Sequence, residues 1–282
     1  MTVSSPVIFS LGSLQLRWYG LFAALAALLF YALMACRAKR RGMDAGKAAD
    51  LMVLIIVSGL VGARLEYVRR FWSEFFAGDW PGIFRVWEGG LVFQGGFIFA
   101  AVACLIFCRY RKYPCGGVAD LIALALPAAH AVARVGCFLN GCCFGRPWNG
   151  WGGVTYAAAE TAVARIQQLQ GLLPASAVLP LPVFPVQLLE ALCCALIALV
   201  IWWMERRRCC DNRRFFVYLI LYCIVRFLVE FLRGDYWPVP QWLTPAQVTT
   251  LFVVLPAALL ALAAVHCWTK RVTPARRNIH TS

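Results

Sequence analysis

The sequence predicts an all-α membrane protein with seven transmembrane helices. Of its 282 residues 62% are hydrophobic and only 14% are charged, and the mean hydropathy is +0.71, so most side chains cannot face water. A spanning helix needs roughly 20 apolar residues. Seven stretches qualify: residues 17–36, 48–68, 89–108, 118–138, 185–204, 215–232 and 245–269.

Clusters of basic residues between these stretches predict the orientation of the chain. Four segments hold most of the 27 lysines and arginines: residues 37–47, 109–112, 206–214 and 270–277. They alternate with the other connections, so placing them in the cytoplasm puts the N-terminus outside and the C-terminus inside. A net charge of +14 could also suggest nucleic acid. Because the basic residues form short clusters rather than one exposed face, we expect no nucleic-acid partner.

We expect residues 1–282 to form a single polytopic domain, because each helix needs its neighbours to bury its polar residues. The one long insert, residues 139–184, follows the fourth span and should form a small external head. It contains a possible short amphipathic helix around residues 157–170 and ends in the proline-rich "LPASAVLPLPVFP". The first span should be retained, because its basic cluster "RAKRR" follows the apolar run instead of preceding it.

Charged residues within the spans are the main functional signal. A charge at the centre of a spanning helix costs roughly 2.5–3.5 kcal/mol, so each needs a partner or a purpose. With the predicted orientation, all fall in the outer half of the membrane: Arg64, Glu66, His130, Arg134, Glu190, Arg226 and Glu230. Tyr19 and Gln94 lie at the same level. In the sixth span, helical spacing places four residues on one stripe: Tyr222, Arg226, Glu230 and Arg233.

Two interpretations of these charges remain open. Arg226 with Glu230, and Arg64 with Glu66, could be pairs that only let helices pack. Alternatively, the arginines bind an anion, because at this level they outnumber the acids. The arginines are Arg17, Arg64, Arg134, Arg226 and Arg233, against Glu66, Glu190 and Glu230. A positive surplus beneath the lipid headgroups favours a phosphate site, and the guanidinium fork suits phosphate better than lysine does.

The stretch "ARVGCFLNGCCFGRPWN", residues 133–149, ends the fourth span. Its cysteines at i, i+5 and i+6 match none of the usual paired zinc spacings, so we expect no metal site. An external disulfide from Cys137 to Cys142 or Cys143, or simple apolar packing, both remain open. Glycines flank Asn140 where the helix must break, and they should free backbone N–H groups to face an anionic oxygen.

These motifs resemble those of the bacterial phosphatidylglycerol–prolipoprotein diacylglyceryl transferase family. The fragments that carry the resemblance extend over nearly the whole chain: "RWYGL" from residue 17, "GARL" from 62, "EGGLVFQGG" from 88, "ARVGCFLNGCCFGR" from 133, "FPVQLLE" from 184 and "VRFLVEFLRGD" from 225. The resemblance implies the same seven-span fold in the bacterial cytoplasmic (inner) membrane, with an external head.

The resemblance also implies roles for individual residues. Arg134 and Arg226 match the two essential arginines of the family. Tyr19, Asn140, Gly145, Glu230 and Arg233 also fall on motif positions. With the stripe and the level of charges described above, we expect four catalytic residues: Arg134, Arg226, Tyr19 and Gln94. The expected substrate-binding residues are Arg134, Asn140, Gly145, Tyr222, Glu230, Arg233 and Arg64. The chain departs from the family pattern at four places: Gln94 and Phe184 stand where the family usually has His, and Cys137 and Cys142 where it has Asn and an acid.

The implied reaction is displacement of the phosphoglycerol headgroup of phosphatidylglycerol by the cysteine thiolate of a prolipoprotein lipobox. The products are a diacylglyceryl thioether and glycerol 1-phosphate. The partners are therefore phosphatidylglycerol, the signal peptide with its lipobox cysteine, and membrane lipid; no metal or organic cofactor is expected. Two alternatives stay open: a repurposed or inactive lipid-binding relative, and a transferase that uses the same lipid donor with a different acceptor.

Overall fold

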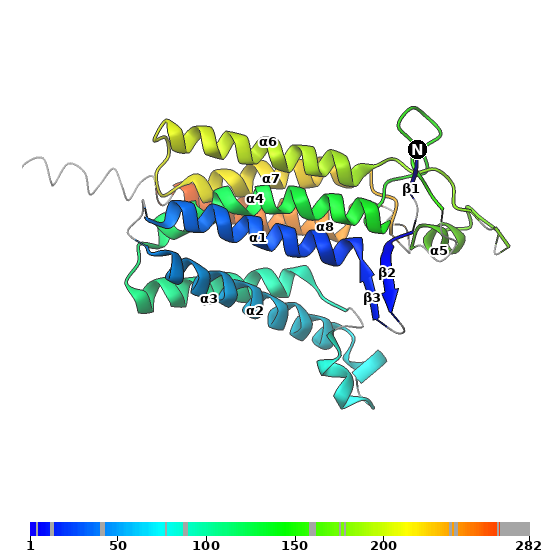
Figure 1. Ribbon diagram of the computed structural model, residues 1–282, viewed down its shortest axis with the longest axis horizontal. Helices are drawn as coiled ribbons and strands as arrows, with labels where there is room; N and C mark the ends of the chain where they lie inside the picture. Colours follow the sequence, from blue (N-terminus) through cyan, green and yellow to red (C-terminus); the bar gives the residue numbers. More distant parts are fainter. Residues whose placement is uncertain are drawn as a thin grey trace, which may run out of the picture. The chain divides into compact units, whose positions relative to one another are not determined.

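The computed structural model describes residues 1–3, 5–11, 14–39, 43–76, 78–86, 90–157, 162–174, 176–177, 179–236, 239, 242–263 and 265. Long apolar helices make up most of it (Figure 1). They are α1 (Trp18–Ala38), α2 (Ala45–Arg70), α3 (Phe93–Arg111), α4 (Cys115–Asn140), α6 (Val186–Arg206), α7 (Arg214–Glu230) and α8 (Pro245–Thr249), which continues into the π-helical turn η5 (Thr250–Val254).

Among the described residues, five helical segments are long and apolar enough to cross a membrane: Trp18–Ala38, Gly46–Arg70, Cys115–Asn140, Val186–Arg206 and Pro245–Ala263. Helices α3 and α7 occupy the expected third and sixth stretches but do not meet this requirement, and α7 has only 17 residues. The expected all-α membrane fold is therefore confirmed, whereas the count of seven spans stays a prediction. The end of the last expected span and the basic segment 270–277 lie outside the described residues.

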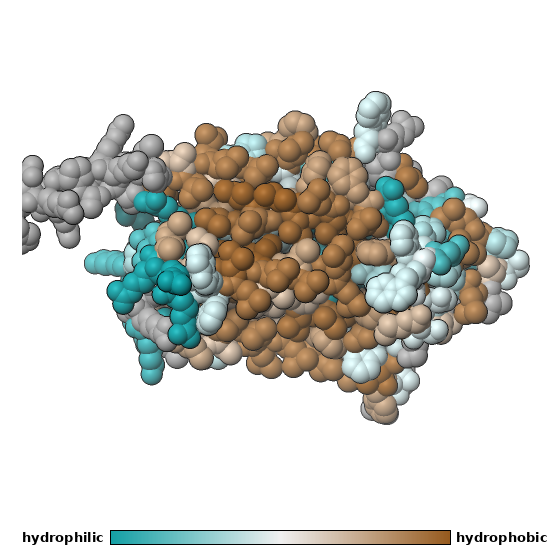
Figure 2. Space-filling view, turned by 90° about the horizontal axis from the view of Figure 1, so that it is seen from above, coloured by the Kyte–Doolittle hydropathy of each residue, from teal (hydrophilic) through white to brown (hydrophobic). Residues whose placement is uncertain are grey.

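The helix surfaces match a lipid environment. On α6 the side chains of Leu192, Leu196 and Leu199 are exposed, although water would disfavour them. Figure 2 shows one face on which hydrophobic residues cover the middle of the helices and hydrophilic residues gather towards their ends. The chain is a multi-pass membrane protein.

Contacts divide the chain into two compact units. One contains Met1–Phe30 and the chain from Ile122 onwards; the other is Tyr31–Leu121. The expected single domain therefore stays a prediction. In the second unit α2 and α3 pack closely because both carry glycine at the contact: a Cβ atom added to Gly62 would lie 2.5 Å from the carbonyl oxygen of Gly95.

The insert after α4 folds together with the start of the chain. Strand β1 (Thr2–Val3) pairs in parallel with β4 (Thr155–Tyr156), and the short helix α5 (Ala162–Leu169) lies within the expected amphipathic segment. Their buried core consists of Val3, Phe138, Phe144, Val154, Tyr156, Val163 and Val183. Strands β2 (Val7–Leu11) and β3 (Leu14–Arg17) form an antiparallel hairpin that leads into α1. No pattern in the sequence predicted these short strands.

Candidate active site

A buried carboxylate, Glu190 on α6, joins three helices of the first unit. Its side chain is 1% exposed. Arg134 on α4 places Nη2 3.0 Å from Oε1, and Arg226 on α7 places Nη1 3.9 Å from Oε2. The hydroxyl of Tyr222 also donates to Oε1, at 3.4 Å. One carboxylate therefore holds both predicted catalytic arginines at the same depth of the bundle.

His130 completes this cluster one turn before Arg134. Its Nε2 accepts a hydrogen bond of 3.1 Å from Nε of Arg134, which places the proton of a neutral imidazole on Nδ1. The imidazole ring packs against Tyr222 with 5.2 Å between ring centroids, and Nδ1 lies 3.7 Å from the sulfur of Cys194. Arg134 is thus fixed by two partners and cannot rotate freely.

Arg226 also pairs with Glu230 one turn later, with Nη2 2.8 Å from Oε2. Glu230 accepts further hydrogen bonds from the hydroxyls of Thr244, at 2.8 Å, and Tyr236. Nη1 of Arg226 is buried and has no hydrogen-bond partner among the described residues. A buried donor without a hydrogen-bond partner costs free energy, and a bound anion that accepts a hydrogen bond from this atom would remove that cost.

Arg233 follows the end of α7 and forms a two-pronged pair with Asp235, whose Oδ1 accepts from Nε at 2.8 Å. Burial raises the pKa of Asp235, and Arg233 opposes this only in part. Burial, together with the hydrogen bond to Glu230, raises the pKa of Tyr236 to about 12. Tyr236 therefore stays a protonated donor over the physiological range.

The charges in this cluster balance, unlike the surplus expected from the sequence. Each of its three arginines lies against a carboxylate: Arg134 against Glu190, Arg226 against Glu190 and Glu230, and Arg233 against Asp235. Of the other two arginines counted at this level, Arg17 donates to Gln15 in the hairpin and Arg64 belongs to the second unit. The cluster therefore offers directed hydrogen-bond donors rather than excess positive charge.

A pocket of about 270 Å³ opens beside the cluster. Its polar lining includes Arg146, Gln170, Glu230, Arg233, Thr244 and Gln247. Ligand pockets usually measure about 300–1,000 Å³, so this one has room for a small polar group rather than for acyl chains.

The turn after α4, within residues 133–149, is hydrogen-bonded to two other segments through its backbone. Gly145 N donates to Phe184 O at 3.1 Å, and Gly234 N donates to Phe144 O at 3.0 Å. The amide groups of Gly141 and Cys142 are also used, within the turn itself. The sequence suggested that these amides are free to donate to an anion. In the structure they already have backbone partners, so this expectation was wrong. A substrate contact of Gly145 remains a prediction.

Replacing Gly145 with alanine should destabilise the protein. The new Cβ would collide with the carbonyl oxygen of Phe184 and approach that of Leu232 to 3.1 Å, and backbone cannot move aside cheaply. We expect a loss of about 1–3 kcal/mol in unfolding free energy. Thermal unfolding in detergent measures it, with Gly20→Ala as the control because nothing lies within 4 Å of that position. Equal melting temperatures for the two variants would show that the turn is not tightly packed.

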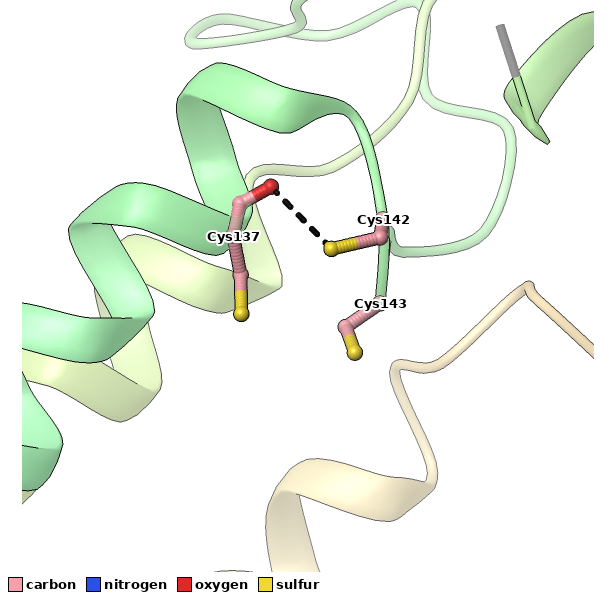
Figure 3. Close-up of side chains that lie close together, drawn as sticks. All are labelled: Cys137, Cys142 and Cys143. Carbon is pink, nitrogen blue, oxygen red and sulfur yellow. Dashed lines mark hydrogen bonds between the residues drawn. The ribbon is translucent and has the colours of Figure 1, made fainter. Parts of the chain in front are cut away.

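Three cysteines of residues 133–149 lie close together at the end of α4 (Figure 3). The thiol of Cys142 donates to the carbonyl oxygen of Cys137 at 3.7 Å, and all three sulfurs lie within 4.8 Å of one another. Contacts with the thiols of Cys137 and Cys142, and then the charges of Arg233 and Arg134, hold the pKa of Cys143 below its ordinary value. The structure contains no disulfide among these three residues.

The remaining predicted site residues are distributed over both units. Tyr19 is half exposed and lies where α1 meets α4: a Cβ atom on Gly136 would come within 2.5 Å of Phe22 and 3.7 Å of Tyr19 Cα. The Oδ1 atom of Asn140 is buried and has no hydrogen-bond partner among the described residues.

Gln94 and Arg64 belong to the second unit. Arg64 donates to the carbonyl oxygens of Gly82, Ile83 and Gly90, whereas Glu66 pairs with Arg69 and Arg70. The expected neutralising pair Arg226–Glu230 is therefore present, but the carboxylate of Glu66 has partners other than the expected Arg64.

Several residues of the cluster were not predicted as site residues: His130, Glu190, Asp235, Tyr236 and Thr244. For Glu190 and His130 the signal was available, since a polar residue within a span needs a partner. Asp235 also had a signal, because it ends the motif "VRFLVEFLRGD". Tyr236 and Thr244 lie beyond α7 in chain that carries no helical periodicity, and no spacing rule relates them to Glu230.

Comparison with known proteins agrees with the resemblance of the motifs. A model of the prolipoprotein diacylglyceryl transferase family matches residues 6–263. A phosphatidylglycerol–prolipoprotein diacylglyceryl transferase of Xanthomonas oryzae is 30% identical over 92% of this chain and 90% of its own length. One of Clostridium tetani is 28% identical over 89% of this chain and 94% of its own length.

Another relative of the same name, from Prochlorococcus marinus, is 33% identical. The match covers 53% of this chain and 53% of that relative, so the chain spans about half the length of that protein. The same holds for the relative from Trichormus variabilis, of which 52% is covered. The family match extends over α1 to α8 and so includes every residue of the Glu190 cluster. The chain therefore belongs to the prolipoprotein diacylglyceryl transferase family.

Proposed function

We propose that this protein transfers the diacylglyceryl group of phosphatidylglycerol to the lipobox cysteine of prolipoproteins. The thiolate sulfur attacks the carbon of the diacylated glycerol that is joined to the phosphate. A carbon–sulfur bond forms there, and the bond from that carbon to the phosphate oxygen breaks. The electron pair leaves with the phosphate oxygen as glycerol 1-phosphate. The observation that carries the proposal is that Arg134 and Arg226, from separate helices, converge on one buried carboxylate. Nη1 of Arg226 has no hydrogen-bond partner among the described residues.

This arrangement suits a departing phosphate. Charge develops on the leaving oxygen in the transition state, and donors that are already fixed in a water-poor site stabilise it without reorganising. Arg134 is held by His130 and Glu190, and Arg226 by Glu230. The two guanidinium groups are therefore oriented before the lipid arrives.

The other contacts are proposed from the family resemblance and the local geometry. The buried acceptor Oδ1 of Asn140 suits a hydroxyl of the glycerol headgroup. Tyr19 and Gln94 are proposed as further catalytic residues. The remaining substrate contacts are Gly145, Tyr222, Glu230, Arg233 and Arg64. No metal is assigned to the transfer step.

We place the protein in the bacterial cytoplasmic membrane with its N-terminus outside and its C-terminus inside, so that the head around α5 and the Glu190 cluster face outward. The basic segments at alternate connections support this orientation. A reporter fused after Ser282 should then be cytoplasmic, and one inserted at Gly171 should be external. Thiol- or protease-accessibility of the two reporters measures this, and an external C-terminal reporter would overturn the orientation.

The direct test of the function is an assay with purified protein, labelled phosphatidylglycerol and a lipobox peptide. We expect a thioether-linked diacylglyceryl peptide and an equal amount of glycerol 1-phosphate. Release of glycerol 1-phosphate without the thioether would indicate a different acceptor. Lipid binding with neither product would indicate a repurposed relative. A lipobox peptide with serine in place of cysteine is the control and should give no product.

A further inference from the structure

The three cysteines at the end of α4 form a cluster that the transfer reaction does not require. Cys137 is buried in the last turn of the helix, and Cys142 and Cys143 follow the glycine that ends it. Figure 3 shows the three side chains close together, with Cys137 on the helix and Cys142 and Cys143 on the chain that follows it. Spacing in the sequence did not predict this, because i, i+5 and i+6 becomes compact only when the helix stops at Asn140 and the chain reverses.

The geometry fits coordination of a thiophilic cation. Zinc bound tetrahedrally at about 2.3 Å from each sulfur separates the sulfurs by about 3.8 Å, whereas a disulfide needs about 2.05 Å. All three sulfurs of the cluster already lie within 4.8 Å of one another. Small side-chain rotations therefore close the site on a cation without moving the backbone.

The backbone of the turn is fixed in the shape that the cluster needs. Cys143 has φ of +58°, a left-handed conformation that costs free energy for a residue other than glycine. Cys142 N donates to Cys137 O at 3.2 Å, and the buried Gln187 donates to Cys142 O at 2.9 Å. These hydrogen bonds hold the residue before Cys143, so the neighbouring backbone fixes the turn in which the cluster lies.

We propose that Cys137, Cys142 and Cys143 bind one thiophilic divalent cation of the zinc type. The three sulfurs bind as thiolates, and those still protonated release their protons to solvent, so the bound cation with three thiolates carries a net charge of −1. Three protein ligands leave one tetrahedral position for water or another small ligand. Thiolates select zinc and its heavier congeners over magnesium or calcium, which prefer oxygen ligands.

Occupation of this site should weaken the transfer reaction. Arg134 lies on α4 one helical turn before Cys137, so the cluster lies next to one of the two proposed phosphate-binding arginines. The net negative charge of the occupied site repels the incoming phosphate and competes for the guanidinium group of Arg134. We expect a saturating cation to slow transfer by about tenfold. The inhibition rests on the proposed function, whereas the cation site does not.

Cadmium titration of the reduced full-length protein in detergent, without lipid or peptide, tests the site. The reductant must be a phosphine, because added thiols would compete. The parent should bind one more equivalent of cadmium tightly than the variant Cys137→Ser/Cys142→Ser/Cys143→Ser does. Cadmium–thiolate charge-transfer absorption detects the binding. The double variant Cys209→Ser/Cys210→Ser is the matched control, since this exposed pair offers thiols outside the cluster. Cys143→Ser alone should weaken the tight equivalent more than about 100-fold.

The outcomes are decisive. Equal binding by the parent and the triple variant would overturn the site, as would a disulfide between any two of the three cysteines in protein purified without reductant. The triple variant should keep basal transfer within about tenfold of the parent, which shows that it folds; if it does not fold, Cys143→Ser carries the test. Added zinc should slow transfer by the parent but not by the triple variant. A parent that binds cadmium but transfers nothing would refute the proposed function and leave the site standing.

Discussion

Arg134→Ala and Arg226→Ala should each slow diacylglyceryl transfer by about 10²–10³-fold while the protein still inserts into the membrane. Losing one of two fixed donors to a departing phosphate costs roughly 2.7–4 kcal/mol of transition-state stabilisation. In each variant, turnover should fall much more than substrate affinity relative to the parent. The reason is that the donors act most strongly when charge has developed on the leaving oxygen.

Lysine at either position should restore little activity. The guanidinium of Arg134 contacts His130 and Glu190 at the same time, and a single ammonium group cannot reproduce that fork. The matched control is Arg165→Ala, an exposed arginine on α5 in the head. Turnover with labelled phosphatidylglycerol and the lipobox peptide gives the comparison. Near-normal turnover in either alanine variant would remove that arginine from the site.

Glu190→Ala should be the most destabilising single change in the cluster. It removes the carboxylate that both arginines share and leaves a buried guanidinium without compensation, which typically costs about 3–5 kcal/mol. Glu190→Gln keeps the volume and one acceptor oxygen, so we expect a smaller loss. Its activity should still fall, since the positions of Arg134 and Arg226 depend on the charge.

Thermal unfolding in detergent measures this ranking. Glu66→Ala is the control, because the partner Arg69 of that carboxylate is 71% exposed and such surface pairs contribute little. If Glu190→Ala melts at the temperature of the parent, the carboxylate does not hold the cluster together. If it melts normally and also transfers normally, the proposal that Glu190 positions the arginines fails as well.

The alternation of apolar runs and basic segments was enough to predict the helical membrane fold, because burial of apolar length in lipid is a local property of each segment. The stripe of Tyr222, Arg226 and Glu230 was predictable for a similar reason, since helical periodicity fixes which residues share a face. Of the two expected neutralising pairs, Arg226–Glu230 could be predicted from this periodicity. The actual partners of Glu66 could not be chosen among several arginines of the same helix.

Only the tertiary structure decided how these pieces meet. The role of Glu190 depends on α4, α6 and α7 placing Arg134, Glu190 and Arg226 at one depth, which no single helix encodes. The pairing of the N-terminal strand with the insert after α4 joins residues about 150 positions apart, and two-residue strands carry no periodic signal. The charge balance of the cluster also differs from the positive surplus that the sequence predicted. The reason is that Asp235, in irregular chain beyond α7, pairs with Arg233. The sequence by itself determined which residues must be buried and on which helix face, whereas the fold determined their partners, because contacts between distant segments depend on how the chain reverses between them.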